Sequence, residues 1–285
     1  MDHLKNTFKL LAKGGVIGIA NIIPGVSGGT MAVVMGIYEP LIEAIGNFFT
    51  NSERRKSYFI FLLKVLSGAG IAIIVLSWVM DYLLIHYESY TYLFFIGLIA
   101  GSIPSIYRTH PEMKINLISL VTFLAGVALI LGMFFSFPEN LQAKNPVEVN
   151  INPSSAFMLF ISGIFSGGSM IMPGVSGSFI LVLLGQYHIV IRAVKHFNLV
   201  PLFFLGIGIA IGIWGFAKMI DYFLKRFPKE TMYFILGLLF ASLIPIFPGL
   251  PSGFIPVLLS IFVVLAGGWI SYRLGMRERE DEVRR

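Results

Sequence analysis

A five-residue motif that combines helix breakers with a hydroxyl group occurs twice in this chain. Pro-Gly-Val-Ser-Gly begins at Pro24 and again at Pro173, each time within an apolar stretch. Proline and glycine interrupt helices, and unpaired backbone groups are costly in lipid, so such a break indicates a function. Helices that resume after the breaks would point free N–H groups and positive dipole ends toward an anion such as phosphate.

We therefore predict one anion-binding site built from both motifs. Serine and threonine hydroxyls add hydrogen-bond donors, and the glycines allow backbone turns that other residues resist. The alternative is that the glycines only permit a sharp turn and close helix packing. The predicted substrate-binding residues are Pro24, Gly25, Ser27, Gly28, Gly29, Thr30, Pro173, Gly174, Ser176, Gly177, Ser178 and Arg192.

The two copies differ in the ionisable residues that follow the motif. When the prolines are aligned, Glu39 corresponds to His188 and Glu43 corresponds to Arg192. Arginine presents a planar fork of donors that suits phosphate, so we predict that Arg192 captures the anion on the outer side of the membrane. The alternative is an ordinary charged residue at the membrane interface.

Four residues are candidates for proton coupling. Histidine titrates near neutral pH, and an ionisable residue within a membrane span is a functional candidate. The four are Glu39, His188, Asp81 and Asp221. The alternatives are helix capping and snorkelling to the interface. Asp221 is also expected to pair with Lys218, which lies one helical turn before it.

The composition places these motifs in a membrane protein. Of the 285 residues, 56% are hydrophobic and 13% are charged, whereas a soluble chain carries roughly a quarter charged residues. Apolar runs recur along the chain and predict full membrane spans. The predicted spans are 58–85, 92–107, 115–137, 199–224, 232–247 and 254–272.

The chain contains an internal duplication. With a shift of 149 residues, 13 of the 31 positions from 14 to 44 are identical, and a shift of 140 aligns Asp81-Tyr82 with Asp221-Tyr222. Each copy holds one motif segment and three spans. Because three is odd, the second copy is predicted to insert upside down, as in secondary transporters. Only the ten residues 14–23 lie in the apolar arm before the first break. A spanning helix needs about 20, so each motif segment is predicted to be a re-entrant hairpin.

The sequence thus predicts an all-α membrane protein with an inverted structural repeat, each half a re-entrant helical hairpin plus three transmembrane helices. The termini are predicted to be cytoplasmic, because that orientation places 16 Lys and Arg residues inside and three outside. The predicted divisions are a first repeat at 1–137 with its hairpin at 14–46, an extracytoplasmic connector at 138–152, a second repeat at 153–272 with its hairpin at 154–196, and a charged cytoplasmic tail at 273–285.

The paired Pro-Gly-Val-Ser-Gly segments in this duplicated chain resemble the PopT-type undecaprenyl-phosphate translocases, a polytopic membrane family formerly known as a domain of unknown function. The resemblance covers nearly the whole chain. It implies a bacterial cytoplasmic-membrane protein that returns the polyprenyl-phosphate carrier from the outer to the inner leaflet for recycling in cell-envelope synthesis. The implied partners are this lipid and the bilayer, and a second copy of the chain is a further candidate.

Other functions fit the sequence less well. The chain has no cysteine, no Walker loop and no metal-binding histidine pair, so we expect no enzyme activity, cofactor or metal. Its net charge of +6 does not require a nucleic-acid partner, because membrane proteins concentrate Lys and Arg in cytoplasmic loops. A small-anion transporter or channel is one alternative, and a membrane polyprenyl-phosphate phosphatase is a second.

Overall fold

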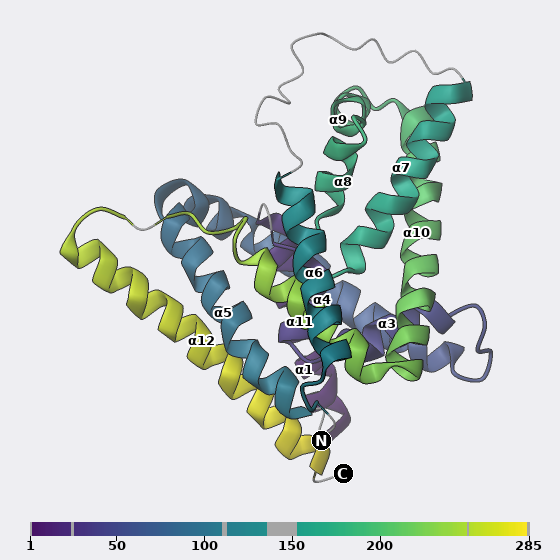
Figure 1. Cartoon of the computed structure of the whole chain (residues 1–285). Helices are drawn as coiled ribbons and strands as arrows, with labels where there is room; N and C mark the ends of the chain where they lie inside the picture. Colours follow the sequence, from purple (N-terminus) through teal and green to yellow (C-terminus); the bar gives the residue numbers. More distant parts are fainter. Residues whose placement is uncertain (1, 24–25, 110–112, 136–152, 250, 284–285) are drawn as a thin grey trace.

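The computed structural model describes residues 2–23, 26–109, 113–135, 153–249 and 251–283. This part of the chain forms twelve α-helices and no strand (Figure 1), which confirms the predicted all-α class. The helices are α1 (Asp2–Ile22), α2 (Gly28–Val34), α3 (Tyr38–Asn47), α4 (Arg55–His86), α5 (Glu88–Thr109), α6 (Leu117–Phe135), α7 (Pro153–Ile171), α8 (Gly177–Leu183), α9 (Tyr187–Lys195), α10 (Leu199–Arg226), α11 (Pro228–Ser242) and α12 (Phe254–Val283).

Five of the described helices are long and apolar enough to cross a membrane, namely α4, α6, α7, α10 and α12. Four of them occupy predicted spans, whereas α7 belongs to the second motif segment. The predicted spans at 92–107 and 232–247 form the helices α5 and α11, which are not among the five. Because α11 has only 15 residues, it is about 22 Å long and too short for a full crossing on its own.

The arm before the first break is predicted to be too short to cross the membrane, and α1 is indeed not among the described helices that are long and apolar enough to cross. The helices before both breaks are nevertheless longer than the ten-residue apolar arm. α1 has 21 residues, because its helix starts in the polar residues before the apolar arm, and α7 has 19 residues. At 1.5 Å per residue, each is about 30 Å long. The chain nevertheless reverses at the second break. In Figure 1, α7 and α8 form a V, and α9 lies at the same upper end as the start of α7.

The two short helices of each half are joined by equivalent turns. Gly36 and Gly185 correspond under the 149-residue shift, and their φ angles are 63° and 69°. This left-handed conformation is the one that glycine commonly adopts at the end of a helix. The duplication detected in the sequence is therefore visible in the backbone.

Close helix pairs are built on glycine. α1 packs along α4 and α7 packs along α10, which are corresponding pairs of the two halves. A Cβ atom added to Gly208 or Gly212 would meet a backbone carbonyl of α7, and one added to Gly97 or Gly101 would meet a backbone carbonyl of α12. Both pairs of glycines have the Gly-x-x-x-Gly spacing that lets two helix backbones approach closely.

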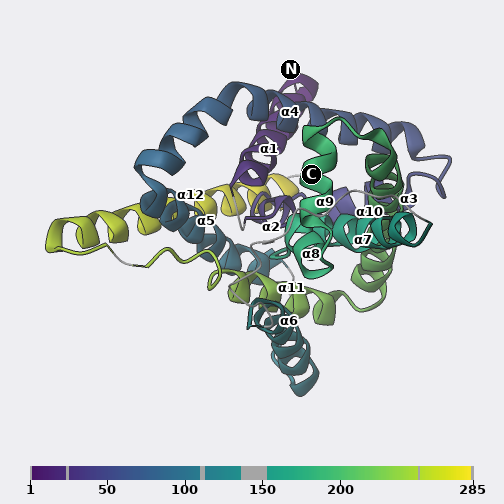
Figure 2. The same cartoon turned by 90° about the horizontal axis from the view of Figure 1, so that it is seen from above.

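The two halves exchange partners but are not enclosed equally. α5 packs against α12 and α6 packs against α11, so each half lends a helix to the other (Figure 2). α3 also packs against α10, while α9 makes no comparable contact with α4. All of α2 is buried, whereas only Gly177 and Leu181 of α8 are buried. The second break is thus more open than the first.

Candidate functional site

The two Pro-Gly-Val-Ser-Gly breaks contact each other. Ser27 is the N-cap of α2, and its Oγ accepts a hydrogen bond from the backbone N–H of Thr30 at 3.1 Å. From the second break, the N–H of Gly174 donates to the Oγ of Ser27 at 3.2 Å and to the Oγ1 of Thr30 at 2.8 Å. Both hydroxyl residues are buried. Two segments related by the internal duplication therefore meet at one place.

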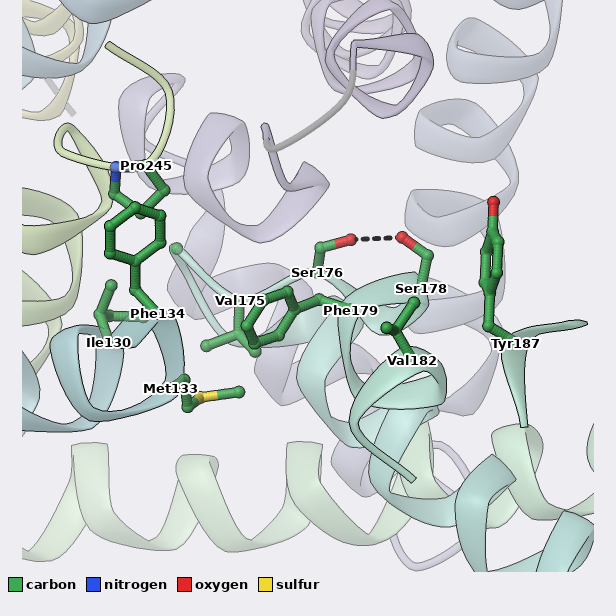
Figure 3. A pocket seen from close by; sticks show the side chains of 11 residues that line it. Ile130, Met133, Phe134, Val175, Ser176, Ser178, Phe179, Val182, Tyr187 and Pro245 are labelled. Atoms are coloured by element: carbon green, nitrogen blue, oxygen red, sulfur yellow. Dashed lines mark hydrogen bonds between the residues drawn. The ribbon is translucent and has the colours of Figure 1, made fainter. Parts of the chain in front are cut away.

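A cavity of about 390 Å³ lies beside the second break (Figure 3). Ser176 and Ser178 contribute hydroxyls that are hydrogen-bonded to each other at 2.9 Å, and Tyr187 contributes a phenol. We call this space the hydroxyl cavity. Its other walls are apolar side chains or backbone, from Ile130, Met133, Phe134, Gly174, Val175, Phe179, Val182 and Pro245.

The hydroxyl cavity can hold a polar group against apolar walls. Ser176 is the N-cap residue of α8, but its side chain makes no capping hydrogen bond. In Figure 3, the hydroxyls of Ser176 and Ser178 face each other, with Phe134 and Met133 to one side and Tyr187 to the other. A hydroxyl both donates and accepts, so this pair can turn its O–H groups toward the oxygens of a bound anion.

The first motif is not equivalent to the second in this conformation. The N–H of Gly28 donates to the Oδ1 of Asn21 at 3.1 Å, and the hydroxyls of Ser27 and Thr30 already bind Gly174. α2 and α8 have seven residues each, so few peptide dipoles add up at their N-termini. In this conformation, the first motif therefore stabilises the backbone of the second.

The glycines of the motifs fit closely into their surroundings. A Cβ atom on Gly29 would come within 2.8 Å of the carbonyl oxygen of Ile171, and one on Gly177 within 2.7 Å of the Cγ of Met170. These glycines therefore permit close packing, whatever else they do. Pro24 and Gly25 lie outside the described residues, and Pro173 is fully buried.

A charged network joins α3 to α10 and was missed from the sequence. Asp221 is buried, and its Oδ2 accepts a hydrogen bond from the Nδ2 of Asn47 and pairs with the Nζ of Lys225, each at 2.8 Å. The prediction that Asp221 pairs with Lys218 is wrong. Its ammonium lies 5.6 Å from the centre of the Trp214 ring. Residues three before and four after Asp221 share its helix face, and the structure selects the latter.

The carboxylate of Glu43 belongs to the same network. It accepts hydrogen bonds from Arg54 at 2.9 Å and from the hydroxyl of Tyr58 at 3.0 Å, and it lies 4.0 Å from the Nζ of Lys225. The pKa of Arg54 is raised above its usual value. The larger cause is its interaction with the hydroxyl of Tyr58, and the second is the negative charge of Glu43. The positive charges of Arg54 and Lys225 lie beside the carboxylate of Glu43 and balance its negative charge.

Comparison with known proteins identifies the family. Residues 17–252 match the family described as undecaprenyl phosphate translocase-like (VCA0040-like). The chain belongs to this family. It is 31% identical over 254 residues to the polyprenyl-phosphate transporter of Vibrio cholerae serotype O1, which covers 85% of this chain and 78% of that protein. It is 30% identical over 283 residues to the polyprenyl-phosphate transporter of Staphylococcus aureus, which covers 95% and 97%. No solved structure matches the chain significantly.

The remaining predicted residues of this family member lie away from the hydroxyl cavity. Arg192 is half-buried on α9, and Glu39, His188 and Asp81 are exposed. None of the four borders the hydroxyl cavity. Within the described ranges, no group of three or more His, Cys, Asp or Glu side chains is placed to hold a metal ion. Gly174, Ser176 and Ser178 of the second motif border the cavity, whereas the spacing of the charged residues in the sequence does not show that they lie outside it.

Proposed function

We propose that this protein carries polyprenyl phosphate, with undecaprenyl phosphate as the expected carrier, from the outer to the inner leaflet of a bacterial cytoplasmic membrane for reuse in cell-envelope synthesis. Family membership and two relatives named as polyprenyl-phosphate transporters support the proposal. The structural observation that carries it is the hydroxyl pair of Ser176 and Ser178 in a cavity whose other walls, apart from the phenol of Tyr187, are apolar side chains or backbone. A charged headgroup on an apolar chain needs donors within apolar walls.

The proposed architecture is an inverted repeat with two re-entrant segments that meet inside the membrane. The pairs α1–α4 and α7–α10 correspond, as do the exchanged pairs α5–α12 and α11–α6. The reversal at the second break and the contact between both breaks support re-entrance. In such transporters, access to a central site alternates as one part rocks against the other.

The proposed orientation places both termini in the cytoplasm. In Figure 1, α1 begins and α12 ends at the lower end of the molecule. The last turn of α10, which carries Lys225 and Arg226, points to the same end. Cytoplasmic loops of membrane proteins are enriched in Lys and Arg, so we assign the lower end to the cytoplasm.

The alternatives differ in what they require of the hydroxyl cavity. A phosphatase needs a nucleophile with an adjacent base or a metal, whereas no His, Asp or Glu is among the described residues that border this cavity. A small-anion transporter needs no apolar walls, since its ligand carries no chain. Purified protein that releases phosphate from a polyprenyl phosphate would support the phosphatase instead.

Depletion of the protein in its native host tests the proposed function. Where no second transporter acts, we expect the phosphate of the carrier lipid to accumulate at the outer cell surface. A reagent that binds surface phosphate and cannot cross the membrane measures this accumulation. Unchanged surface exposure under every growth condition would contradict lipid transport, and a re-expressed wild-type copy serves as the control.

A further inference from the structure

A second, larger cavity lies on the other side of the second break from the hydroxyl cavity. It has a volume of about 470 Å³ and is bounded by α3, α6, α10, α11 and the Met172–Pro173 segment. Among the described residues that border it, Glu230 in the first turn of α11 is the one with a charge. We call this space the apolar cavity. Its walls suit an uncharged chain, and a carboxylate at one end repels phosphate.

The two cavities lie in series along α6. Thr122 and Ala125 border the apolar cavity, and Ile130 and Phe134 border the hydroxyl cavity. Ala125 and Ile130 are five positions apart along the helix, which is about 7.5 Å. α6 runs from the lower to the upper end in Figure 1. The apolar cavity therefore lies toward the end that we assign to the cytoplasm.

Only a thin layer of protein separates the cavities. Pro173 borders the apolar cavity and Gly174 borders the hydroxyl cavity. Ile130, Val175 and Leu238 pack together in one small cluster at this level. A small movement of the second break would thus join the two spaces.

The apolar cavity reaches the surface of the molecule at the exposed side of α10. Its wall residues Met219 and Phe223 expose 45% and 42% of their surface. The exposed face of a transmembrane helix is covered by lipid, so this opening faces the bilayer. A long apolar chain can therefore enter sideways without crossing water.

We propose that the apolar cavity binds the isoprenoid chain of the substrate on the inner-leaflet side of the second break. The inference rests on the proposed function and deepens it, because it makes chain binding a determinant of substrate choice. The phosphate binds in the hydroxyl cavity, and the chain is received in the apolar cavity as the headgroup passes the break. Glu230 then favours release of the anionic headgroup toward the cytoplasm.

Filling the apolar cavity tests this proposal. Ala125→Trp places an indole at the cavity wall, while Ala128→Trp places one on an exposed position of the same helix outside the cavity. We expect Ala125→Trp to slow transport of undecaprenyl phosphate by about tenfold, equivalent to displacing roughly two methylene groups. Transport of a two-isoprene prenyl phosphate should change little, and Ala128→Trp should leave both unchanged. Met219→Trp on the opposite wall is the second variant if Ala125→Trp does not fold.

The possible outcomes distinguish a failure of the proposed chain-binding site from a failure of the proposed function. Equal slowing of both lipids, or behaviour of the cavity variants like Ala128→Trp, would overturn the chain site while lipid transport stands. Wild-type protein that moves neither lipid would instead overturn the proposed function. Measurements use the full chain in vesicles, with yield and monodispersity recorded for each variant.

A second inference follows from the unequal enclosure of the two halves. α3 lies so close to α10 that a Cβ atom on Gly46 would come within 2.9 Å of the Cα of Lys218, and the Asn47–Asp221 hydrogen bond joins the two helices. Under the shifts of 149 and 140 residues, Asn47 corresponds to His196 and Asp221 corresponds to Asp81. The corresponding helices α9 and α4 make no comparable contact.

The geometry points to two contacts that form alternately, Asn47–Asp221 in one state and Asp81–His196 in the other, and we call each of them a latch. The Asn47–Asp221 contact closes the end of the molecule near the α10–α11 turn, and an Asp81–His196 contact closes the opposite end when the first latch opens. In an inverted repeat, exchanging the conformations of the two halves produces the opposite-facing state. Each latch then stabilises one of the two states.

Cross-linking of introduced cysteine pairs tests the latches, because the sequence has no cysteine of its own. The two variants are Asn47→Cys with Asp221→Cys, and Asp81→Cys with His196→Cys. We expect a short bis-thiosulfonate reagent to link both pairs in native membranes, and reductant to reverse both links. Linkage of the first pair without the second, in protein that still transports lipid, would overturn the alternation. Single-cysteine variants control for links between molecules.

Discussion

At the residue scale, Ser176 and Ser178 are the side chains on which recognition of the headgroup depends. Replacing both with alanine removes two donors from the hydroxyl cavity and changes its shape little. Hydrogen bonds to charged groups are the stronger class, so we expect transport at low substrate concentration to fall by roughly 10- to 100-fold. Initial rates against substrate concentration in vesicles measure this.

A serine outside the site provides the control. The hydroxyl of Ser77 bonds to the carbonyl of Ile74 in its own helix at 3.3 Å, so Ser77→Ala should leave transport unchanged. If the Ser176→Ala, Ser178→Ala double variant is obtained at normal yield and transports at the wild-type rate, these two hydroxyls do not bind the headgroup. Valine substitutions of Gly28 or Gly177 are poor tests, because both glycines are closely packed.

Arg192 provides a second test at this scale. On the proposed orientation, α9 lies at the outer end, where a phosphate from the outer leaflet first arrives. We expect Arg192→Gln to weaken capture more than Arg192→Lys, because lysine keeps the charge but loses the fork of donors. Uptake into oriented vesicles at several substrate concentrations distinguishes the two. If both variants match the wild type, Arg192 is an interfacial residue without a role in capture.

The repeated motif predicted which residues gather at the site, but not which hydroxyls are available there. Ser27 and Ser176 are identical in the sequence pattern, yet Ser27 binds Gly174 while Ser176 faces a cavity. This difference arises from packing between the two breaks, which spacing within one segment does not contain. For the same reason, the partner of Asp221 on α3 could not be predicted.

At the element scale, close packing of the helix pairs depends on glycines that lie against the backbone of the partner helix. A Cβ atom on Gly208 would meet the carbonyl of Phe160, whereas one on Gly206 of the same helix would meet nothing within 4 Å. We expect Gly208→Ala to destabilise the protein by about 1–3 kcal/mol, as for other overpacked contacts. Gly206→Ala should have little effect. Thermal unfolding in detergent measures both, and equal melting temperatures would contradict backbone contact between α7 and α10.

Spans were predictable where apolar residues run without interruption, as in α4, α6, α10 and α12. The length of α1 was not predictable, because hydropathy marks the membrane-buried part of a helix and not its polar beginning. α1 continues through the charged residues Lys5, Lys9 and Lys13 before its apolar arm. Helical hydrogen bonds form in both environments, so composition alone does not locate such a boundary.

At the scale of the whole molecule, the orientation is testable by labelling single cysteines with a reagent that does not cross the membrane. We expect Ser52→Cys and Arg226→Cys to react from the cytoplasmic side. Glu88→Cys and Lys195→Cys should react from the outer side. All four side chains are exposed. Reaction of Ser52→Cys and Lys195→Cys from the same side would contradict the inverted arrangement.

The most direct test of lipid transport is movement of undecaprenyl phosphate between the leaflets of vesicles that contain the purified protein. The fraction of phosphate accessible from outside is followed over time with an impermeant reagent. We expect wild-type protein to equilibrate the lipid between leaflets much faster than empty vesicles do. The Ser176→Ala, Ser178→Ala double variant should approach the rate of empty vesicles. Wild-type vesicles that exchange the lipid no faster than empty ones would contradict the central claim.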